Sequence, residues 1–279
     1  MSFIVFAAVV FAAVLHASWN AVAKSQSDKL LTMTALVFGS AFWGALLLPM
    51  TNAPHPQSYI YIAVGVVLHV GYQIVLQASY KLGDLSLVYP ISRGTAPLIV
   101  TVFSVVVWQI DFEPVTLMGV VAIILAVFCL AFTKNGAGGR NPKAVVFALM
   151  TACFIASYSL TDGTGARLSG DPLGYYARLT IANGVFFIPF VLFKKPVLVM
   201  RAFQQQKMIM FFGGFASFAA FAIVMWAFTQ SPIAMVTALR ESSIMFAMMI
   251  GVFFFKEKFG LLKLAATILT LLGMILLRL

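Results

Sequence analysis

Two arginines stand inside long apolar stretches of this sequence, where a charged side chain is costly. Arg93 lies between Pro90 and Pro97 in YPISRGTAPLI, and Arg240 is followed by Glu241 in LRESS. An arginine at the centre of a bilayer costs roughly 2.5–3.5 kcal/mol on insertion scales, so it faces a protein interior or water. A guanidinium group can grip a carboxylate or phosphonate through two hydrogen bonds. The two arginines are therefore predicted to bind an anionic group of a solute.

The prolines around Arg93 predict a particular kind of helix. Proline removes a backbone donor and frees a carbonyl group, which a membrane interior tolerates only against protein or a cavity. The segment that begins at Tyr89 is thus predicted to be an interrupted helix lining a wet, substrate-binding cavity. Two alternative roles for Arg93 stay open. It could pair with Glu241 and hold helices together, or it could lie at the membrane surface.

Glu241 is a candidate coupling residue, that is, a carboxyl group that could take up and release a proton. Burial favours the protonated form of a carboxyl group, so a buried acid can exchange a proton. A permanent ion pair is the alternative role. Because Arg240 and Glu241 are adjacent on a helix, they are expected to point about 100° apart. One would then face the cavity while the other pairs with a different helix.

A polar stripe follows one face of another apolar run. His69, Tyr72, Gln73, Gln77 and Tyr80 are separated by steps that keep them on one side of a helix. This face is predicted to be interior and to line the substrate cavity, with hydrogen bonding between helices as the alternative. His69 is a candidate proton carrier, and its alternative role is a packing donor.

The first apolar run repeats this spacing at His16, Trp19, Asn20 and Lys24. Lys24 is expected to extend to the membrane surface. Trp19 and Asn20 are candidates for the wall of the substrate site. For Trp19, the membrane interface is an equally good position.

Tyr158 and Asp162 lie four residues apart in SYSLTDGTGAR, near the end of an apolar run. Both are candidate substrate contacts. Asp162 could instead be solvated, or it could pair with Arg167 or Arg178.

Composition identifies the class of protein. Of the 279 residues, 62% are hydrophobic and only 9% are charged, whereas soluble domains carry about 25% charged residues. The net charge of +10 comes mostly from short loops, so it indicates membrane orientation and not nucleic-acid binding. Cys129 and Cys153 are isolated, and no metal, nucleophile-elbow or phosphate-loop motif is present. No cofactor and no enzymatic activity are expected.

Length predicts the number of spans. A helix needs roughly 20 apolar residues to cross a bilayer. The sequence therefore predicts an all-α integral membrane protein with ten transmembrane helices, at about 2–22, 31–50, 58–80, 85–108, 114–133, 143–165, 173–193, 207–229, 232–255 and 260–278. Most of the 18 Lys and Arg residues fall in loops after the odd-numbered spans. The positive-inside rule then places these loops in the cytoplasm and both termini outside.

The sequence also repeats itself. A shift of 147 residues places YPISRGTAPLI on VTALRESSIMF, with Arg93 on Arg240. Each half has five spans, and an odd number makes the halves insert with opposite orientation. The prediction is two inverted five-helix repeats, 1–134 and 143–279, joined by the linker 135–142. Transporters built in this way bind their substrate near the midplane, between the halves.

These features resemble an EamA-type ten-helix transporter of the drug/metabolite transporter superfamily. The resemblance rests on Trp19 in HASWN, the proline-containing fourth span, Glu257 in FFFKEKFG and the small residues of the last span. Relatives usually have a glutamate after the fourth span, where WQIDFEP offers Asp111 or Glu113 instead. An arginine common in their second span is missing here, while the seventh span has Arg178. The resemblance also implies cytoplasmic termini, which the charge rule opposes.

The resemblance implies a secondary transporter that works by alternating access across the inner membrane, most often as an exporter. The two arginines favour an amino acid or another zwitterionic or anionic solute. The expected partners are this small molecule, the lipid bilayer and protons, in a monomer or homodimer. A membrane-embedded enzyme or an accessory subunit without transport activity is the alternative.

Overall fold

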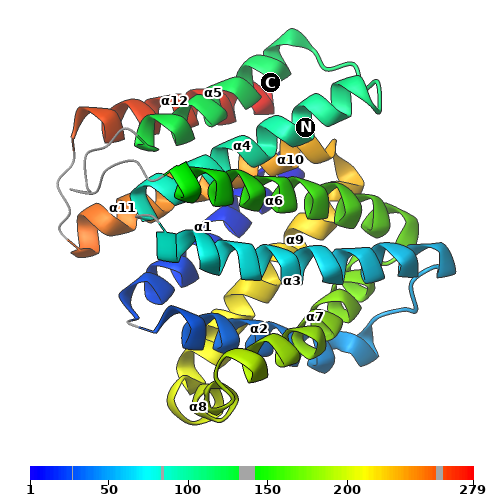
Figure 1. The fold of residues 1–279 in the computed structure, drawn as a ribbon. Helices are drawn as coiled ribbons and strands as arrows, with labels where there is room; N and C mark the ends of the chain where they lie inside the picture. Colours follow the sequence, from blue (N-terminus) through cyan, green and yellow to red (C-terminus); the bar gives the residue numbers. More distant parts are fainter. Residues whose placement is uncertain (27, 83–84, 132–141, 256–259) are drawn as a thin grey trace.

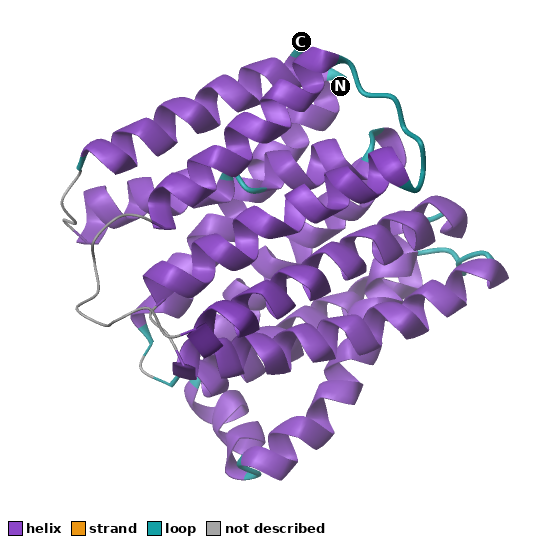
Figure 2. Ribbon diagram, turned by 45° about the horizontal axis from the view of Figure 1, so that its top comes forward, coloured by secondary structure: helices purple, strands orange, loops and turns teal. Residues whose placement is uncertain are grey.

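The computed structural model of the chain is all-helical (Figures 1 and 2). It describes residues 1–26, 28–82, 85–131, 142–255 and 260–279. The helices are α1 (Phe3–Ser25), α2 (Lys29–Leu47), η1 (Leu48–Met50), η2 (Pro56–Ser58), α3 (Tyr59–Leu82), α4 (Leu85–Val106), α5 (Pro114–Ala131), α6 (Pro142–Ser169), α7 (Pro172–Lys194), α8 (Val197–Gln205), η3 (Ile209–Gly213), α9 (Gly214–Gln230), α10 (Ile233–Arg240), α11 (Ser243–Phe255) and α12 (Leu261–Arg278).

The helices identify a multi-span membrane protein. Among the described residues, 7 helical segments are long and apolar enough to cross a membrane. Three shorter apolar helices accompany them, at Ile91–Val106, Pro114–Cys129 and Leu264–Arg278. Each of these segments overlaps one of the ranges predicted from hydropathy. The two chain termini lie close together at one end of the bundle (Figures 1 and 2).

Acidic residues fix the start of two helices. Asp28 accepts a hydrogen bond from the backbone N–H of Leu31, at 3.0 Å, and so caps α2. Asp171 caps α7 in the same way through Gly174, at 2.9 Å. The other oxygen of Asp171 accepts from the N–H of Asn52, at 2.8 Å. This bond fixes the loop after α2 to the start of α7.

The packing of the bundle joins helices that are far apart in sequence. Helix α1 packs on α9, α3 packs on α6, α2 packs on α7, and α5 packs on α12. Helices α4 and α10 meet each other, and they bring the two arginine-containing segments together. The core of the bundle contains fully buried aromatic side chains such as Tyr158, Phe218 and Phe228.

Glycines set the closest helix contacts. A Cβ atom at Gly273 of α12 would lie 2.8 Å from the carbonyl oxygen of Gly119 in α5. A Cβ atom at Gly214 of α9 would lie 2.6 Å from the Cα of Gly39 in α2. Small residues let helix backbones approach in this way inside membranes. Next to the second contact, the η3 segment has π-helical turns, and Trp43 donates from Nε1 to the carbonyl oxygen of Phe211, at 2.9 Å.

Helix α8 occupies a stretch for which the sequence predicted only a loop. Leu198 and Ala202 are buried, and the helix packs against α2. Met200 and Phe203 lie on its exposed side. This spacing is that of a short amphipathic helix, which a 20-residue hydropathy criterion overlooks.

The prediction that the fourth span is interrupted was wrong. Helix α4 is α-helical from Leu85 to Val106, through Pro90, Gly94 and Pro97. Inside a membrane protein, neighbouring helices and local hydroxyl groups compensate for the backbone groups that a proline disturbs.

The interrupted helix lies in the second half of the chain instead. Helix α10 ends at Arg240, and α11 begins at Ser243. The connecting turn is tight, because the N–H groups of Glu241 and Ser242 donate to carbonyl groups three residues earlier, both at 3.0 Å. The turn contains no proline or glycine. The two helices and the turn together form one apolar span, Ile233–Ile250.

Candidate functional site

Three charged side chains meet at the centre of the bundle. Arg93 on α4 donates from Nε to Oε2 of Glu241 in the turn after α10, at 2.8 Å. The other oxygen of Glu241 lies 3.9 Å from Nη2 of Arg240. All three residues are at least 95% buried. The ion-pairing alternative for Arg93 and Glu241 therefore has direct geometric support. As expected for two adjacent residues, one of them, Glu241, pairs with a different helix, although its second oxygen stays near Arg240.

Arg240 has no hydrogen-bond partner in the described chain. It is 2% exposed, and none of its three guanidinium nitrogens makes a hydrogen bond with the part of the chain that the structure describes. Its guanidinium carbon lies 5.4 Å from the centre of the Phe221 ring, a cation–π distance. The buried hydroxyl groups of Thr237, Ser242 and Ser243 likewise lack partners there. Buried donors without acceptors are costly, so this group of donors suits the acceptor atoms of a ligand.

An aromatic wall stands beside Arg240, with Phe221 of α9 at its centre. The Tyr176 ring stacks on Phe221 with centroids 5.9 Å apart, and His16 lies edge-on at 6.3 Å. His69 and Tyr158 lie at 6.3 and 6.5 Å from the same ring. The wall therefore combines side chains from α1, α3, α6, α7 and α9 around one guanidinium group. It can accept an apolar part of a solute whose charged end contacts Arg240.

One member of this wall, His69, pairs with a buried carboxyl group. Nε2 of His69 is 2.8 Å from Oδ2 of Asp162, and the Asp162 side chain is fully buried. Tyr175 donates from its hydroxyl group to Oδ1 of the same carboxylate, at 3.4 Å. Gly65 leaves room for that oxygen, because a Cβ atom there would lie 2.6 Å from it. The pair links α3 to α6 inside the bundle.

Comparison with known proteins places the second half of the chain in a family. Residues 142–279 match the model of the EamA-like transporter family. The second half of this chain is an EamA-like transporter domain. This family consists of transporters, which are typically not enzymes. Arg240, Glu241 and Asp162 all belong to the EamA-like domain, whereas Arg93 and His69 come from the first half of the chain.

A solved structure extends the likeness to the whole chain. In this crystal structure of another protein, the match covers 98% of this chain and 98% of the other, with a TM-score of 0.77 at 17% sequence identity. At this identity the likeness shows the fold alone. No sequence among curated proteins matches the chain at a significant level.

The predicted site residues of the first helix lie near the EamA-like domain. Trp19 contacts His16 edge-on with centroids 5.0 Å apart, and His16 in turn contacts the aromatic wall. Nε1 of Trp19 is buried and has no partner among the described residues. Asn20 instead donates from Nδ2 to the carbonyl oxygen of His16 in its own helix, at 2.7 Å.

The polar stripe of α3 reaches two regions. Tyr72 contacts Tyr158 edge-on, with centroids 5.6 Å apart. Gln73 is buried, and its Oε1 atom has no partner among the described residues. Gln77 donates to the sulfur of Met33 on α2, at 3.4 Å. The side chain of Tyr89 lies outside the described part of the structure, as does Glu257.

Asp162 is not paired with either arginine that the sequence suggested. Arg167 donates to the carbonyl oxygens of Phe228 and Ser231, at 2.7 and 2.9 Å. Arg178 donates to backbone carbonyl oxygens near the start of α7. The prediction failed because α6 continues to Ser169, which places Asp162 inside the EamA-like domain and not at the end of a span.

Sequence reasoning missed three aromatic residues of the site. Tyr175 and Tyr176 are adjacent in an apolar run, where their hydroxyl groups would need partners, and this was the available signal. Phe221 belongs to the stretch FASFAAFAIVMW, in which an apolar pocket wall was expected without a specific residue.

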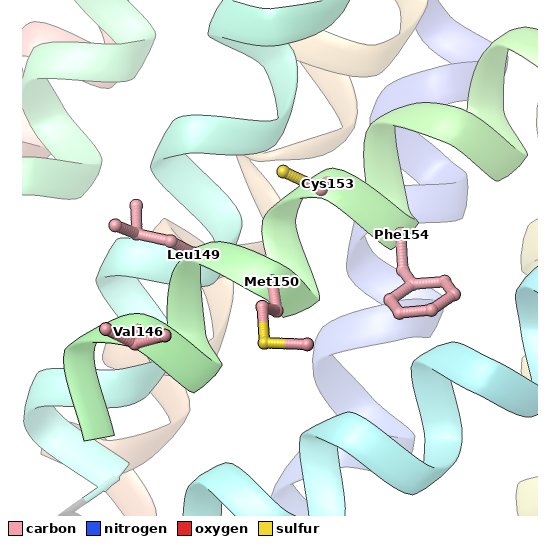
Figure 3. A pocket seen from close by; sticks show the side chains of 5 residues that line it. All are labelled: Val146, Leu149, Met150, Cys153 and Phe154. Atoms are coloured by element: carbon pink, nitrogen blue, oxygen red, sulfur yellow. The ribbon is translucent and has the colours of Figure 1, made fainter. Parts of the chain in front are cut away.

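A shallow apolar hollow lies on the outer face of the EamA-like domain (Figure 3). It is lined by Val146, Leu149, Met150, Cys153 and Phe154 of α6. Four of these side chains are exposed, so the hollow faces the surroundings of the bundle and not the charged cluster. Among the described residues, no group of three His, Cys, Asp or Glu side chains could hold a metal ion.

Proposed function

We propose that the chain is a secondary transporter that moves a small zwitterionic or anionic metabolite across the inner membrane by alternating access, as an exporter. The observation that carries this proposal is the guanidinium group of Arg240, which is buried without a hydrogen-bond partner in the described chain. A carboxylate or phosphonate would supply the missing acceptors in a bidentate arrangement. The aromatic wall beside it would then contact the rest of the solute.

The proposed architecture is ten spans in two inverted five-helix repeats, 1–134 and 143–279, joined by 135–142. Helix packing supports it. In the two repeats, α1 corresponds to α6, α2 to α7, α3 to α9 and α5 to α12. When each helix is exchanged for its counterpart, the contact of α1 with α9 becomes that of α6 with α3. Likewise, the contact of α2 with α9 becomes that of α7 with α3, while α2–α7 and α5–α12 become themselves. This pattern is the one that a twofold axis between the halves produces.

The proposed mechanism uses the boundary between the halves. Arg93 belongs to the first half, and its partner Glu241 belongs to the second. A rocking motion of one half against the other would open the Arg240 region alternately to each side of the membrane. The Arg93–Glu241 pair would remain as the central connection during this motion. The surrounding lipid bilayer completes the proposed environment, for a monomer or homodimer.

Transport in liposomes tests the proposal. Purified protein is first screened for thermal stabilisation by amino acids, carboxylates and phosphonates. Compounds that stabilise it are then assayed for saturable flux and counterflow. We expect both activities in the wild type and in Arg278→Ala, which changes an exposed arginine, and their loss in Arg240→Ala. A stabilising solute that shows neither saturation nor counterflow would exclude a carrier.

A further inference from the structure

The pairing of His69 with Asp162 is not used in the solute binding proposed above. Nε2 of His69 and Oδ2 of Asp162 are 2.8 Å apart, and the side chains are 11% and 0% exposed. In the described residues, His69 is the one ion-pair partner of Asp162. An ionised carboxylate inside a protein requires a compensating charge or strong hydrogen bonds. Here that compensation depends on whether the imidazole group carries a proton.

Histidine is suited to this dependence, because its charge changes near neutral pH. The hydroxyl group of Tyr175 also donates a hydrogen bond to Asp162, at 3.4 Å, but it brings no charge. The pair can therefore exist in two states within the bundle. It is neutral when His69 is protonated, and it carries one negative charge when His69 is neutral.

The two states differ in their effect on Arg240. The His69 ring stacks on Tyr158, with centroids 4.3 Å apart, and lies 6.3 Å from Phe221. Phe221 in turn lies 5.4 Å from the Arg240 guanidinium carbon. Phe221 thus lies close to both His69 and Arg240. Tyr158 also adjoins both groups of side chains, because it stacks on His69 and its ring centre lies 6.5 Å from that of Phe221.

The surrounding charges determine the sign of this coupling. Arg93 and Glu241 form an ion pair and largely cancel, so Arg240 contributes one positive charge. With His69 neutral, Asp162 offsets that charge. With His69 protonated, Arg240 is unopposed. Among the described residues, the other titratable or charged groups of the elements packed around the pair include His16 on α1, Tyr61 and Tyr72 on α3, Arg93 on α4, Tyr158 on α6, Tyr175 and Tyr176 on α7, Arg240 on α10 and Glu241 after it. Helix α9 contains no titratable residue.

We propose that His69 and Asp162 form a proton-binding site, and that its protonation strengthens the binding of an anion beside Arg240. This inference rests on the proposed transport function. Proton and anion then bind together and cross together, so export requires an outward gradient of the anion that exceeds the inward gradient of the proton. At an effective dielectric constant of about 20, one unit charge about 10 Å away changes anion affinity by roughly tenfold.

Histidine NMR tests the proton site without any solute. The chain has 3 histidines, so nitrogen-15 labelling of histidine gives few signals, and His55→Gln and His16→Gln assign them. We expect the His69 signal to change from neutral to protonated as the buffer is acidified. In Asp162→Asn it should stay neutral in the same buffers. Asp111→Asn, a matched change of an exposed aspartate, should behave as the wild type. The proton site would be overturned if the His69 signal did not change on acidification, or if it changed in Asp162→Asn as it does in the wild type.

Anion binding tests the coupling. Binding of glutamate, succinate and methylphosphonate is measured in acidic and alkaline buffers. For a probe that binds, we expect affinity on the order of tenfold higher in the acidic buffer. This difference should disappear in Asp162→Asn and in His69→Gln, which provides a second variant if the first does not fold.

The outcomes separate this inference from the proposed transport function. If a probe shows saturable flux that Asp162→Asn does not change, the proposed transport function stands and the coupling is overturned. If none of the three probes binds, the coupling to anions is overturned together with the proposed solute class. The NMR result then decides the proton site by itself.

Discussion

Arg93 and Glu241, which are 148 residues apart, form a buried ion pair of 2.8 Å between α4 and the turn that separates α10 from α11. The pair joins the two halves of the chain at the position where the internal repeat aligns two arginines. The first half supplies one arginine that is paired, and the second half supplies one, Arg240, that has no hydrogen-bond partner in the described residues. Symmetric positions in the sequence thus have different roles in the structure.

Arg93→Ala is expected to destabilise the protein by about 3–5 kcal/mol, because it leaves the Glu241 carboxylate buried without its main partner. Adding Glu241→Ala should recover part of this loss, since both charges are then absent. Thermal unfolding of the single and double variants in detergent measures both effects. Normal stability of Arg93→Ala would show that the pair does not hold the halves together.

Arg240→Ala and Arg240→Lys should insert and purify normally while solute affinity falls. A hydrogen bond to a charged group contributes about 1.5–3 kcal/mol, so the alanine variant should bind roughly 10- to 150-fold more weakly. The lysine variant keeps the charge but loses the planar fork, so its loss should be smaller. Equilibrium binding of a solute identified by thermal shift provides the measurement. Unchanged affinity in Arg240→Ala would remove Arg240 from the site.

Cysteine labelling tests which face of α3 contacts water. In a protein without Cys129 and Cys153, a cysteine at Gln73 is expected to react with a water-soluble thiol reagent in one transport state. A cysteine at Val67 or Ile74, which are 69% and 38% exposed on the outer face, should stay unlabelled in the bilayer. Equal labelling of both faces would contradict a cavity at Gln73.

Gly273→Ala should destabilise the bundle by about 1–3 kcal/mol, because the added methyl group meets the backbone of α5. Gly260→Ala is the matched control, since a Cβ atom there meets nothing within 4 Å. Thermal unfolding of the two variants is compared under the same conditions. If both variants were similarly stable, the packing of α5 on α12 would accommodate the added methyl group without loss of stability.

The charges of the loops predict the membrane orientation. A C-terminal reporter that is active only in the periplasm should be active on this chain, because most basic residues lie in loops at the opposite end. A signal from a reporter that functions only in the cytoplasm would reverse this orientation, in agreement with the termini implied by the family resemblance.

Hydropathy predicted the spans because a bilayer imposes length and composition on every helix that crosses it. The pairing of Arg93 with Glu241 was foreseen as one alternative, since few charges lie inside the spans. The contact of His69 with Asp162 was not foreseen, because each residue was considered on its own helix and packing decides which helices meet. The break after Arg240 also escaped prediction, because no proline or glycine marks it and the prolines of α4 suggested a break there.

The turn between α10 and α11 places the ends of two helices beside the site. The peptide dipoles of a helix sum to about half a positive elementary charge at its N-terminus and about half a negative one at its C-terminus. Helix α10 ends at Arg240 and α11 begins at Ser243, so the two partial charges lie together and largely cancel. The attraction for an anion at this place therefore depends on the Arg240 side chain, and the backbone does not replace it when Arg240 is substituted.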